Sequence, residues 1–180
     1  MRFRNLELEG GGRMIQVYTG NGKGKTTAAL GLALRAAGAG LHVYIAQFAK
    51  GRICSEHKTL EKIKNIKVEQ FGKICFIRGK PQLLDMELAR AALKKIKKII
   101  ACGSYRVIIL DEINVALKLK LVCLKDVLEL IKHTPATIEL VLTGRCAPAA
   151  IVKAADLVSR INEVKHYYRR GVTARRGIEF

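Results

Sequence analysis

The sequence predicts an α/β domain in which a mostly parallel sheet of six strands lies between two layers of helices. Short apolar runs alternate with longer helical stretches, which is the order that produces parallel βαβ units. The 180 residues suit one domain, and 49% apolar with 27% charged residues is typical of a packed globular protein. No apolar run approaches the roughly 18 residues that span a bilayer, so no membrane association is expected.

Six short apolar runs are the predicted strands. Each is bounded by polar residues or glycine, and their lengths are typical of strands buried in a parallel sheet. In such a sheet, ligands collect at the carboxyl ends of the strands. The six ranges are Ile15 to Tyr18, His42 to Phe48, Lys67 to Phe71, Val107 to Leu110, Ile138 to Thr143 and Leu157 to Ile161.

Four longer stretches between these runs are the predicted helices. The first carries Ala and Leu around its whole circumference, so we expect it to be buried. Pro81 is expected at the first position of the second helix, and Pro135 follows the end of the third. The ranges are Thr27 to Ala37, Gln82 to Ala101, Leu124 to Lys132 and Pro148 to Ala155.

The amino-terminal residues differ from the rest of the chain. Three successive glycines, residues 10–12, precede Arg13, so residues 1–13 are predicted to be a flexible leader before a single domain, residues 14–180. No secretory signal segment is recognisable. The five cysteines form no C-x-x-C pair, which argues against a disulfide framework or zinc cluster and favours a reducing, cytoplasmic location. We expect His42, His57 and His133 to be ordinary surface or core side chains.

The net charge is strongly positive. Thirty-three Lys and Arg against fifteen Asp and Glu leave +18, which favours anionic partners such as phosphates. Part of the excess is a lysine run at 94–98 that reads as a solvated helix face. Aromatic residues that could stack on bases are sparse, so nucleic acid is not an expected partner.

A glycine-rich segment after the first predicted strand is the clearest motif. Residues 15–29 read IQVYTGNGKGKTTAA, an apolar strand, then alternating glycines, then a helix. Without a Cβ, the backbone can turn its N–H groups toward phosphate oxygens at the positive end of the helix. Lys25 adds a positive charge, and the Thr26 hydroxyl suits magnesium on the same phosphates. The residues expected to bind ATP here are Gly20, Asn21, Gly22, Lys23, Gly24, Lys25, Thr26 and Thr27.

This loop departs from the strict phosphate-loop pattern. The pattern G-x-x-x-x-G-K-[ST] requires glycine at position 19, where this chain has Thr19, and its first glycine comes one residue later. The loop is therefore a variant. With the strand order above, it predicts a P-loop NTPase-like three-layer α/β/α sandwich of the RecA-like type, with a mostly parallel six-stranded sheet.

Acidic and basic side chains follow two further predicted strands. The segment RVIILDE ends in Asp111 and Glu112, and either carboxylate can approach magnesium, or manganese in its place, directly or through water. Arg145 follows LVLTG, where it can face phosphate oxygens or form a structural ion pair. Arg35, in the Ala- and Leu-rich helix, needs the phosphates or a carboxylate as partner. The predicted metal ligands are Thr26, Asp111 and Glu112.

Several motifs together resemble the corrinoid adenosyltransferases of the CobA/BtuR type, which include CobO. The segments are VYTGNGKGKTTAALGLALRAAG, QFAKG, LDEINVAL, LTGR, AADLV, EVKH and the closing GIEF, in the family's order. The resemblance implies that the Co(I) of a reduced corrinoid attacks the 5′ carbon of ATP and releases triphosphate, with the nucleotide reversed along the loop. It also implies a flavoprotein reductant and a homodimer. Under it, Lys25, Thr26 and Glu112 are the catalytic residues, and Asn21, Arg35, Glu112 and Arg145 lie near the nucleotide.

The corrinoid side of the site departs from the family. Where the family often has Phe and Trp, this chain reads FGKICFIRG, so Cys75, Phe76 and Ile77 are expected to form that wall. His166, in EVKHYYRRG, contacts the corrinoid or the nucleotide, or lies on an exposed basic tail. Residues 1–13 are shorter than the family's covering helix. Two other readings stay open: a general P-loop ATPase or nucleotide kinase, and a nucleic-acid-dependent ATPase.

Overall fold

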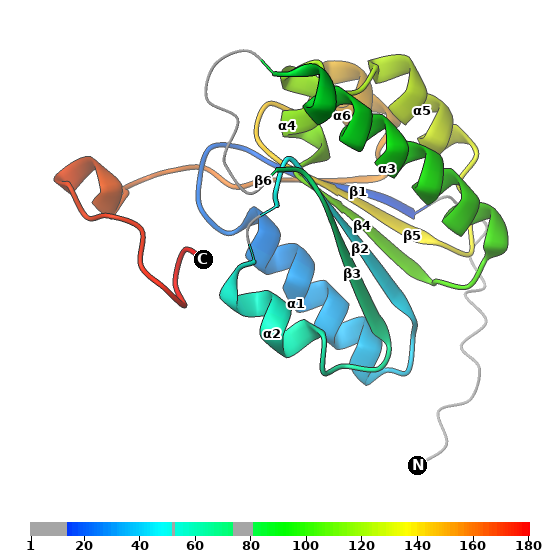
Figure 1. The fold of residues 1–180 in the computed structure, drawn as a ribbon, viewed down its shortest axis with the longest axis horizontal. Helices are drawn as coiled ribbons and strands as arrows, with labels where there is room; N and C mark the ends of the chain where they lie inside the picture. The colour runs from blue at the N-terminus through cyan, green and yellow to red at the C-terminus, as the bar shows by residue number, and fades with distance from the viewer. Residues whose placement is uncertain (1–13, 52, 74–80) are drawn as a thin grey trace.

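The computed structural model describes residues 14–51, 53–73 and 81–180, and its centre is one parallel sheet. Its six strands lie in the order β3-β2-β4-β5-β1-β6, and every neighbouring pair is parallel (Figure 1). The predicted sheet is therefore confirmed. The strands are β1 (Met14–Thr19), β2 (Val43–Phe48), β3 (Ile66–Phe71), β4 (Val107–Asp111), β5 (Glu139–Thr143) and β6 (Leu157–Arg160).

Helices cover both faces of this sheet. Figure 1 shows α1 and α2 on one face and α3, α4, α5 and α6 on the other, which makes the predicted three-layer α/β/α sandwich. The helices are α1 (Lys25–Gly38), α2 (Ser55–Leu60), α3 (Leu83–Cys102), α4 (Ile113–Lys118), α5 (Leu124–Lys132) and α6 (Ala149–Ala154), and a 3₁₀ turn, η1, spans Tyr167–Arg170.

Two apolar clusters hold the layers together. Ala29, Ala33 and Ala36 of α1 pack on Val43, Ile45 and other residues on one face of the sheet. A larger cluster joins the other face to α3, α4, α5 and α6. Every residue of β2 and β4 is buried, because helices cover both faces of these central strands. All four residues of β6 are exposed, as expected of a sheet edge.

The predicted elements agree with the structure to within two residues at each end, with two corrections. Helix α1 is not buried on all sides: Thr27, Ala28 and Arg35 are exposed and Leu34 is 48% exposed, because only its alanine face lies on the sheet. Pro81 is not the first helical residue, since Gln82 caps α3. Three short elements were not predicted: α2, α4 and η1.

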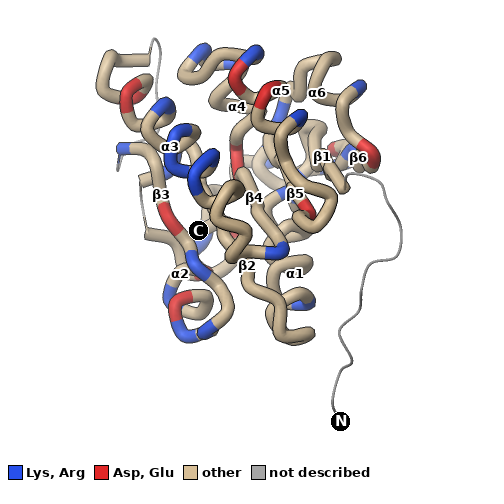
Figure 2. Tube along the Cα trace, turned by 90° about the vertical axis from the view of Figure 1, so that its right-hand side faces the viewer, with Lys and Arg blue, Asp and Glu red and all other residues tan. Residues whose placement is uncertain are grey.

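Lys and Arg are not confined to one layer of the described structure. Figure 2 shows Lys and Arg on helices of both layers. No helix within the described ranges is long and apolar enough to cross a membrane. The predicted leader, residues 1–13, lies outside the described residues.

After β6 the chain leaves the sheet and then returns toward the start of α1 (Figure 1). Gly171 ends η1 in the left-handed conformation, with φ 82°. The last residues reach the glycine-rich loop, because Lys23 Nζ donates to the Ile178 carbonyl at 2.9 Å. The carboxyl-terminal end of the chain thus lies at the predicted nucleotide site.

Candidate nucleotide-binding site

The predicted site residues gather at the carboxyl edge of the sheet. The glycine-rich loop leaves β1 after Thr19 and enters α1 at Lys25, while Asp111 ends β4. Strand register aligns Tyr18 of β1 with Thr143 of β5, and Gln47 of β2 with Asp111. Four parallel strands therefore deliver polar side chains to one edge, as this architecture requires of a ligand site.

Two loop glycines are needed for a close approach between backbones. Gly20 has φ 99°, and a Cβ there would lie 2.3 Å from the Ile161 carbonyl oxygen. The Gly22 N–H donates to that same oxygen at 2.8 Å. The Gly22 amide is therefore hydrogen-bonded to the chain after β6 in this structure, and its predicted role in phosphate binding stays a prediction. Gly24, with φ 123°, begins α1.

Lys25 is buried at the base of the loop. Its ammonium donates to the Gly22 carbonyl at 2.6 Å. Burial lowers the pKa of Lys25 and nearby Arg145 lowers it further, whereas Glu112 and Asp111 oppose this. A phosphate placed in the loop would replace the carbonyl with a stronger, charged acceptor.

Asp111 is the centre of a buried hydrogen-bond network. Its Oδ1 accepts from Thr26 Oγ1 at 2.9 Å and from Thr143 Oγ1 at 2.7 Å. Its Oδ2 accepts from Lys50 Nζ at 2.7 Å and from Gln47 Nε2 at 3.1 Å. We call these five residues, Thr26, Gln47, Lys50, Asp111 and Thr143, the inner wall.

The network keeps Asp111 ionised. Burial alone would raise its pKa, but the charge of Lys50 and the hydrogen bonds from Lys50, Thr143 and Thr26 hold the pKa below its usual value. The Lys50 pKa is raised: burial lowers it, and the pairing with Asp111 outweighs burial. Asp111 is thus a carboxylate at neutral pH, with two threonine hydroxyls at one oxygen and a cation at the other.

Glu112 has the opposite electrostatic setting. Burial and the neighbouring Asp111 raise the pKa of Glu112, while Lys50, Lys25 and Arg145 oppose that rise. Its backbone lies in the left-handed region with φ 62°, which is strained for a residue with a Cβ and is common at functional sites. The Glu112 N–H donates to Thr143 Oγ1 at 3.0 Å, and a Cβ on Gly144 would lie 3.2 Å from Glu112 Oε2. The strained turn directs this carboxylate toward the end of β5.

The opposite side of the loop is formed by the returning carboxyl-terminal segment. Lys23 Nζ donates to Glu179 Oε1 at 2.6 Å and to the Tyr167 hydroxyl at 2.9 Å. The Tyr167 hydroxyl also donates to Glu179, and the Arg175 guanidinium lies 4.6 Å from the Tyr167 ring centre. We call Lys23, Tyr167, Arg175 and Glu179 the outer wall. It is more exposed than the inner wall: the Lys23 and Glu179 side chains are 38% and 18% exposed.

The structure brings most, but not all, predicted site residues together. Arg145 is exposed, and its charge acts on Lys25 and Glu112, so it shares their edge. Arg35 lies ten residues along α1 from Lys25, about 15 Å at the rise of an α-helix, and so is not brought to the loop. His166 lies with its ring 4.8 Å from that of Tyr167. Asn21 and Thr27 are exposed at the loop and the start of α1. The corrinoid-wall prediction for Cys75, Phe76 and Ile77 falls outside the described residues.

Sequence reasoning missed several residues of both walls. Lys50 and Gln47 stand in QFAKG, at the end of a predicted strand, where polar side chains reach the site edge. Thr143 is likewise the last residue of β5. The position of each could have been inferred from its strand. Tyr167 and Glu179 carry no such signal, because their contact with Lys23 joins positions 144 and 156 residues apart.

The inner wall fits a magnesium ion. Thr26 Oγ1 and Thr143 Oγ1 converge on Asp111 Oδ1, and hydroxyl and carboxylate oxygens are the ligands that this hard cation prefers. The depressed pKa of Asp111 supplies the negative charge. The oxygen atoms present therefore suit the predicted metal, and two of the predicted ligands are in direct contact, because Thr26 Oγ1 lies 2.9 Å from Asp111 Oδ1.

Fold and site together define a P-loop nucleotide-binding protein. In keeping with this class, a KaiC-like protein of Pyrococcus horikoshii has a similar fold, with a TM-score of 0.57 over 85% of this chain and 74% of that one, at 15% identity. The family model described as "ATP:corrinoid adenosyltransferase BtuR/CobO/CobP" matches residues 12–180. The chain belongs to this family, as the motifs of the sequence indicate.

Similar proteins named corrinoid adenosyltransferases agree with this assignment. The chain is 32% identical over 169 residues to a corrinoid adenosyltransferase of Pseudomonas aeruginosa, an alignment covering 93% of this chain and 83% of that protein. It is 33% identical to one from Sinorhizobium, covering 93% and 80%. The corrinoid adenosyltransferase CobA of Salmonella typhimurium is 30% identical, covering 93% and 85%.

Proposed function

We propose that this chain transfers the 5′-deoxyadenosyl group of ATP to the Co(I) of a reduced corrinoid and releases triphosphate. The observation that carries the proposal is the phosphate loop closed by Asp111 in a chain that belongs to the adenosyltransferase family. Cobalt donates the electron pair that forms the cobalt–carbon bond. The bond between the 5′ carbon and the triphosphate oxygen breaks, and its electron pair leaves with triphosphate. Cobalt is formally oxidised to Co(III), and no protein nucleophile is required.

The loop would stabilise the leaving group. Negative charge grows on the triphosphate as the carbon–oxygen bond breaks, and fixed donors aimed at developing charge are an efficient form of catalysis. Lys25 is already held at the loop by the Gly22 carbonyl, and it would move only locally to reach a phosphate. Arg145 and the exposed Lys23 add positive charge around the same space.

Thr26 and Asp111 would hold magnesium, with Glu112 reaching it through water. When bound, the ion would neutralise part of the triphosphate charge. Lys50 and Gln47 would hold Asp111 in place through its other oxygen. Removing divalent metal with a chelator is therefore expected to stop transfer, and magnesium or manganese should restore it.

Family membership leads us to expect three further properties. The chain would act as a homodimer, it would receive its electron through a flavoprotein that reduces the corrinoid, and it would work in the cytoplasm. Light scattering in solution would test the first, and reconstitution with a reduced flavoprotein in place of a chemical reductant would test the second.

Product analysis tests the proposed reaction. The chain is mixed with ATP, magnesium and cobalamin under a strong reductant, and the cobalamin spectrum and the phosphate products are followed together. The proposal predicts a spectral change to an alkylated corrinoid and one triphosphate per turnover, formed only when reduced corrinoid is present. Steady release of ADP and orthophosphate without corrinoid would instead identify a general P-loop ATPase, and stimulation by polynucleotide would identify a nucleic-acid-dependent one.

A further inference from the structure

A buried histidine outside the predicted site is connected to the inner wall through one glutamine. His57 lies on α2 and is 4% exposed, and Gln47 at the end of β2 is 1% exposed. His57 Nε2 lies 2.7 Å from Gln47 Oε1, and Gln47 Nε2 lies 3.1 Å from Asp111 Oδ2. Three buried polar groups from α2, β2 and β4 thus form one continuous chain of hydrogen bonds.

The direction of each hydrogen bond in this chain follows from chemistry. Asp111 is an ionised carboxylate and can only accept, so the Gln47 amide nitrogen must face it. The Gln47 oxygen then faces His57, and His57 Nε2 must carry the hydrogen. Gln70 Nε2 approaches the same oxygen at 3.4 Å, a longer contact. Of these two hydrogen bonds to the Gln47 oxygen, the one from His57 Nε2 is therefore the shorter.

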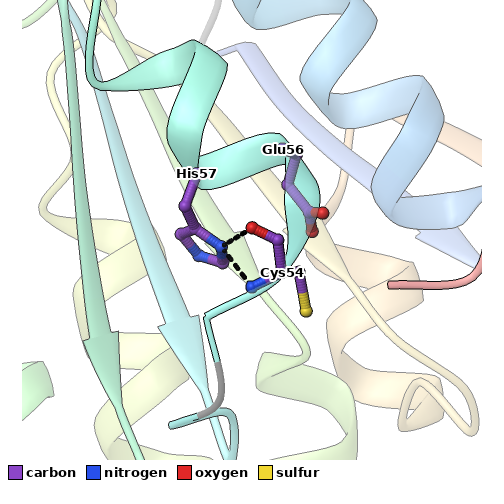
Figure 3. Close-up of side chains that lie close together, drawn as sticks. All are labelled: Cys54, Glu56 and His57. Atoms are coloured by element: carbon purple, nitrogen blue, oxygen red, sulfur yellow. Dashed lines mark hydrogen bonds between the residues drawn. The ribbon is translucent and has the colours of Figure 1, made fainter. Parts of the chain in front are cut away.

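The other ring nitrogen of His57 fixes this tautomer. Figure 3 shows the ring turned toward the Cys54 backbone, whose N–H lies 2.9 Å from His57 Nδ1. The Cys54 carbonyl oxygen also lies near this nitrogen, at 3.1 Å, but the N–H is closer and its bond to Nδ1 is part of the capping box of α2. Nδ1 therefore accepts the N–H, and the hydrogen resides on Nε2. In the opposite tautomer, Gln47 would have to turn its oxygen toward Asp111 Oδ2, and the two oxygens would repel each other.

The same geometry argues against a metal at this histidine. Ligand atoms of Cys54, Glu56 and His57 lie within 4.8 Å of one another (Figure 3). A metal bound on that side would need the Nδ1 lone pair, which already accepts the Cys54 N–H. The hydrogen bond to Gln47 explains why a polar side chain such as His57 is buried at this position.

From these contacts we infer that His57 is a positioning residue for the magnesium site. It holds the Gln47 amide so that its N–H faces Asp111 Oδ2, which leaves Asp111 Oδ1 directed at Thr26 and Thr143. His57 is not among the predicted nucleotide or metal ligands, and it would act on Asp111 only through Gln47. The inference rests on the proposed magnesium role of Asp111.

Two substitutions separate the two ring nitrogens. His57→Asn places an amide near the Nδ1 position, so it keeps an acceptor for the Cys54 N–H but lacks the donor to Gln47. His57→Gln places an amide nitrogen near the Nε2 position and keeps the donor. A purely structural role in starting α2 predicts that Asn is the better replacement, whereas the positioning role predicts that Gln is.

The test measures ATP binding by calorimetry with and without magnesium, on variants whose melting temperatures are recorded. We expect His57→Asn to weaken magnesium-dependent ATP binding about tenfold, the scale of a lost hydrogen bond to a charged network. His57→Gln should stay within about twofold of wild type, and ATP binding without magnesium should not change in either. In a Gln47→Leu background, His57→Asn should have no further effect.

The outcomes separate this inference from the proposed function. If magnesium strengthens ATP binding in wild type, but the Asn and Gln variants bind alike, the role of His57 is overturned and the proposed function stands. If magnesium has no effect in wild type, the metal site and the role of His57 both fall. Nitrogen NMR of the wild-type histidines gives a readout that needs no variant: finding the hydrogen of His57 on Nδ1 overturns the inference.

Discussion

The two walls of the phosphate loop differ in how their charges are held. On the inner wall, Asp111 is 1% exposed and its ion pair with Lys50 is supported by three neutral donors. On the outer wall, Lys23 and Glu179 are paired near solvent, where water and salt screen the attraction. The inner wall therefore has one fixed arrangement that suits a metal ion, while the outer wall is held by contacts that a ligand can displace.

The largest expected effect comes from the loop lysine that both walls flank. Under the proposed function, Lys25→Ala removes a donor to the departing triphosphate, so adenosyl transfer should fall about 100- to 1000-fold. The variant should remain folded, because Lys25 makes its hydrogen bond within the loop. Rates are measured from the cobalamin spectrum, with melting temperature as control. A folded variant with the wild-type rate would exclude the loop as the phosphate site.

The inner ion pair should be costly to break. Lys50→Met leaves Asp111 as a buried charge without its cation, which costs about 3 kcal/mol or more in the free energy of unfolding. Denaturant titration measures this loss. The matched variant Lys23→Met removes the cation of the outer wall and should leave the unfolding midpoint nearly unchanged, because that pair lies near solvent. Equal losses from both variants would contradict the distinction between the walls.

Glu112 should oppose stability where Asp111 supports it. The raised pKa of Glu112 means that its ionisation is unfavourable in the folded chain, so Glu112→Gln should raise the melting temperature at pH 7 by about 2 °C. The gain should vanish below the unfolded-state pKa, about 4.3, where the carboxyl is protonated in both states. Transfer activity should fall in the same variant. Thermal unfolding of Glu112→Gln and wild type at pH 7 and below the unfolded-state pKa measures this difference. A lower melting temperature for the variant at pH 7 would contradict the prediction.

The smallest expected effect lies on the outer wall. Glu179→Gln releases Lys23 from its carboxylate partner, so ATP should bind about twofold more tightly at low ionic strength. Near 1 M salt the difference should disappear, since the screening length falls to about 3 Å. Calorimetry at the two salt concentrations measures it. A large loss of ATP affinity would instead assign Glu179 to the binding site itself.

The sheet was predictable because its signal is local. Each strand is a short apolar run, and the carboxyl edge followed from the alternation of strands and helices. Helix α2 was missed because SEHKTL is short and mostly polar. The position of α2 depends on the contact between buried His57 and Gln47, ten residues earlier on another element. The hydrophobic periodicity of the sequence does not predict this contact.

The site was predictable in part for the same reason. Asp111 ends β4 and Thr26 begins α1 just after the loop that follows β1, so both could be expected at the carboxyl edge, where they lie 2.9 Å apart. The phosphates or a carboxylate were expected as partners of Arg35, because a charge in an Ala- and Leu-rich helix was taken to be buried. The outer face of α1 is exposed, and Arg35 lies there. The role of Ile161 against Gly20 and Gly22 depends on β6 pairing with β1, which only the folded sheet reveals.

Determining the structure of the chain with ATP and magnesium tests most directly whether the loop is a triphosphate cradle. We expect phosphate oxygens against Lys25 and the loop amides, and the ion between Thr26 and Asp111. Well-ordered nucleotide bound elsewhere, with Lys25 still on the Gly22 carbonyl and Thr26 still on Asp111, would contradict it.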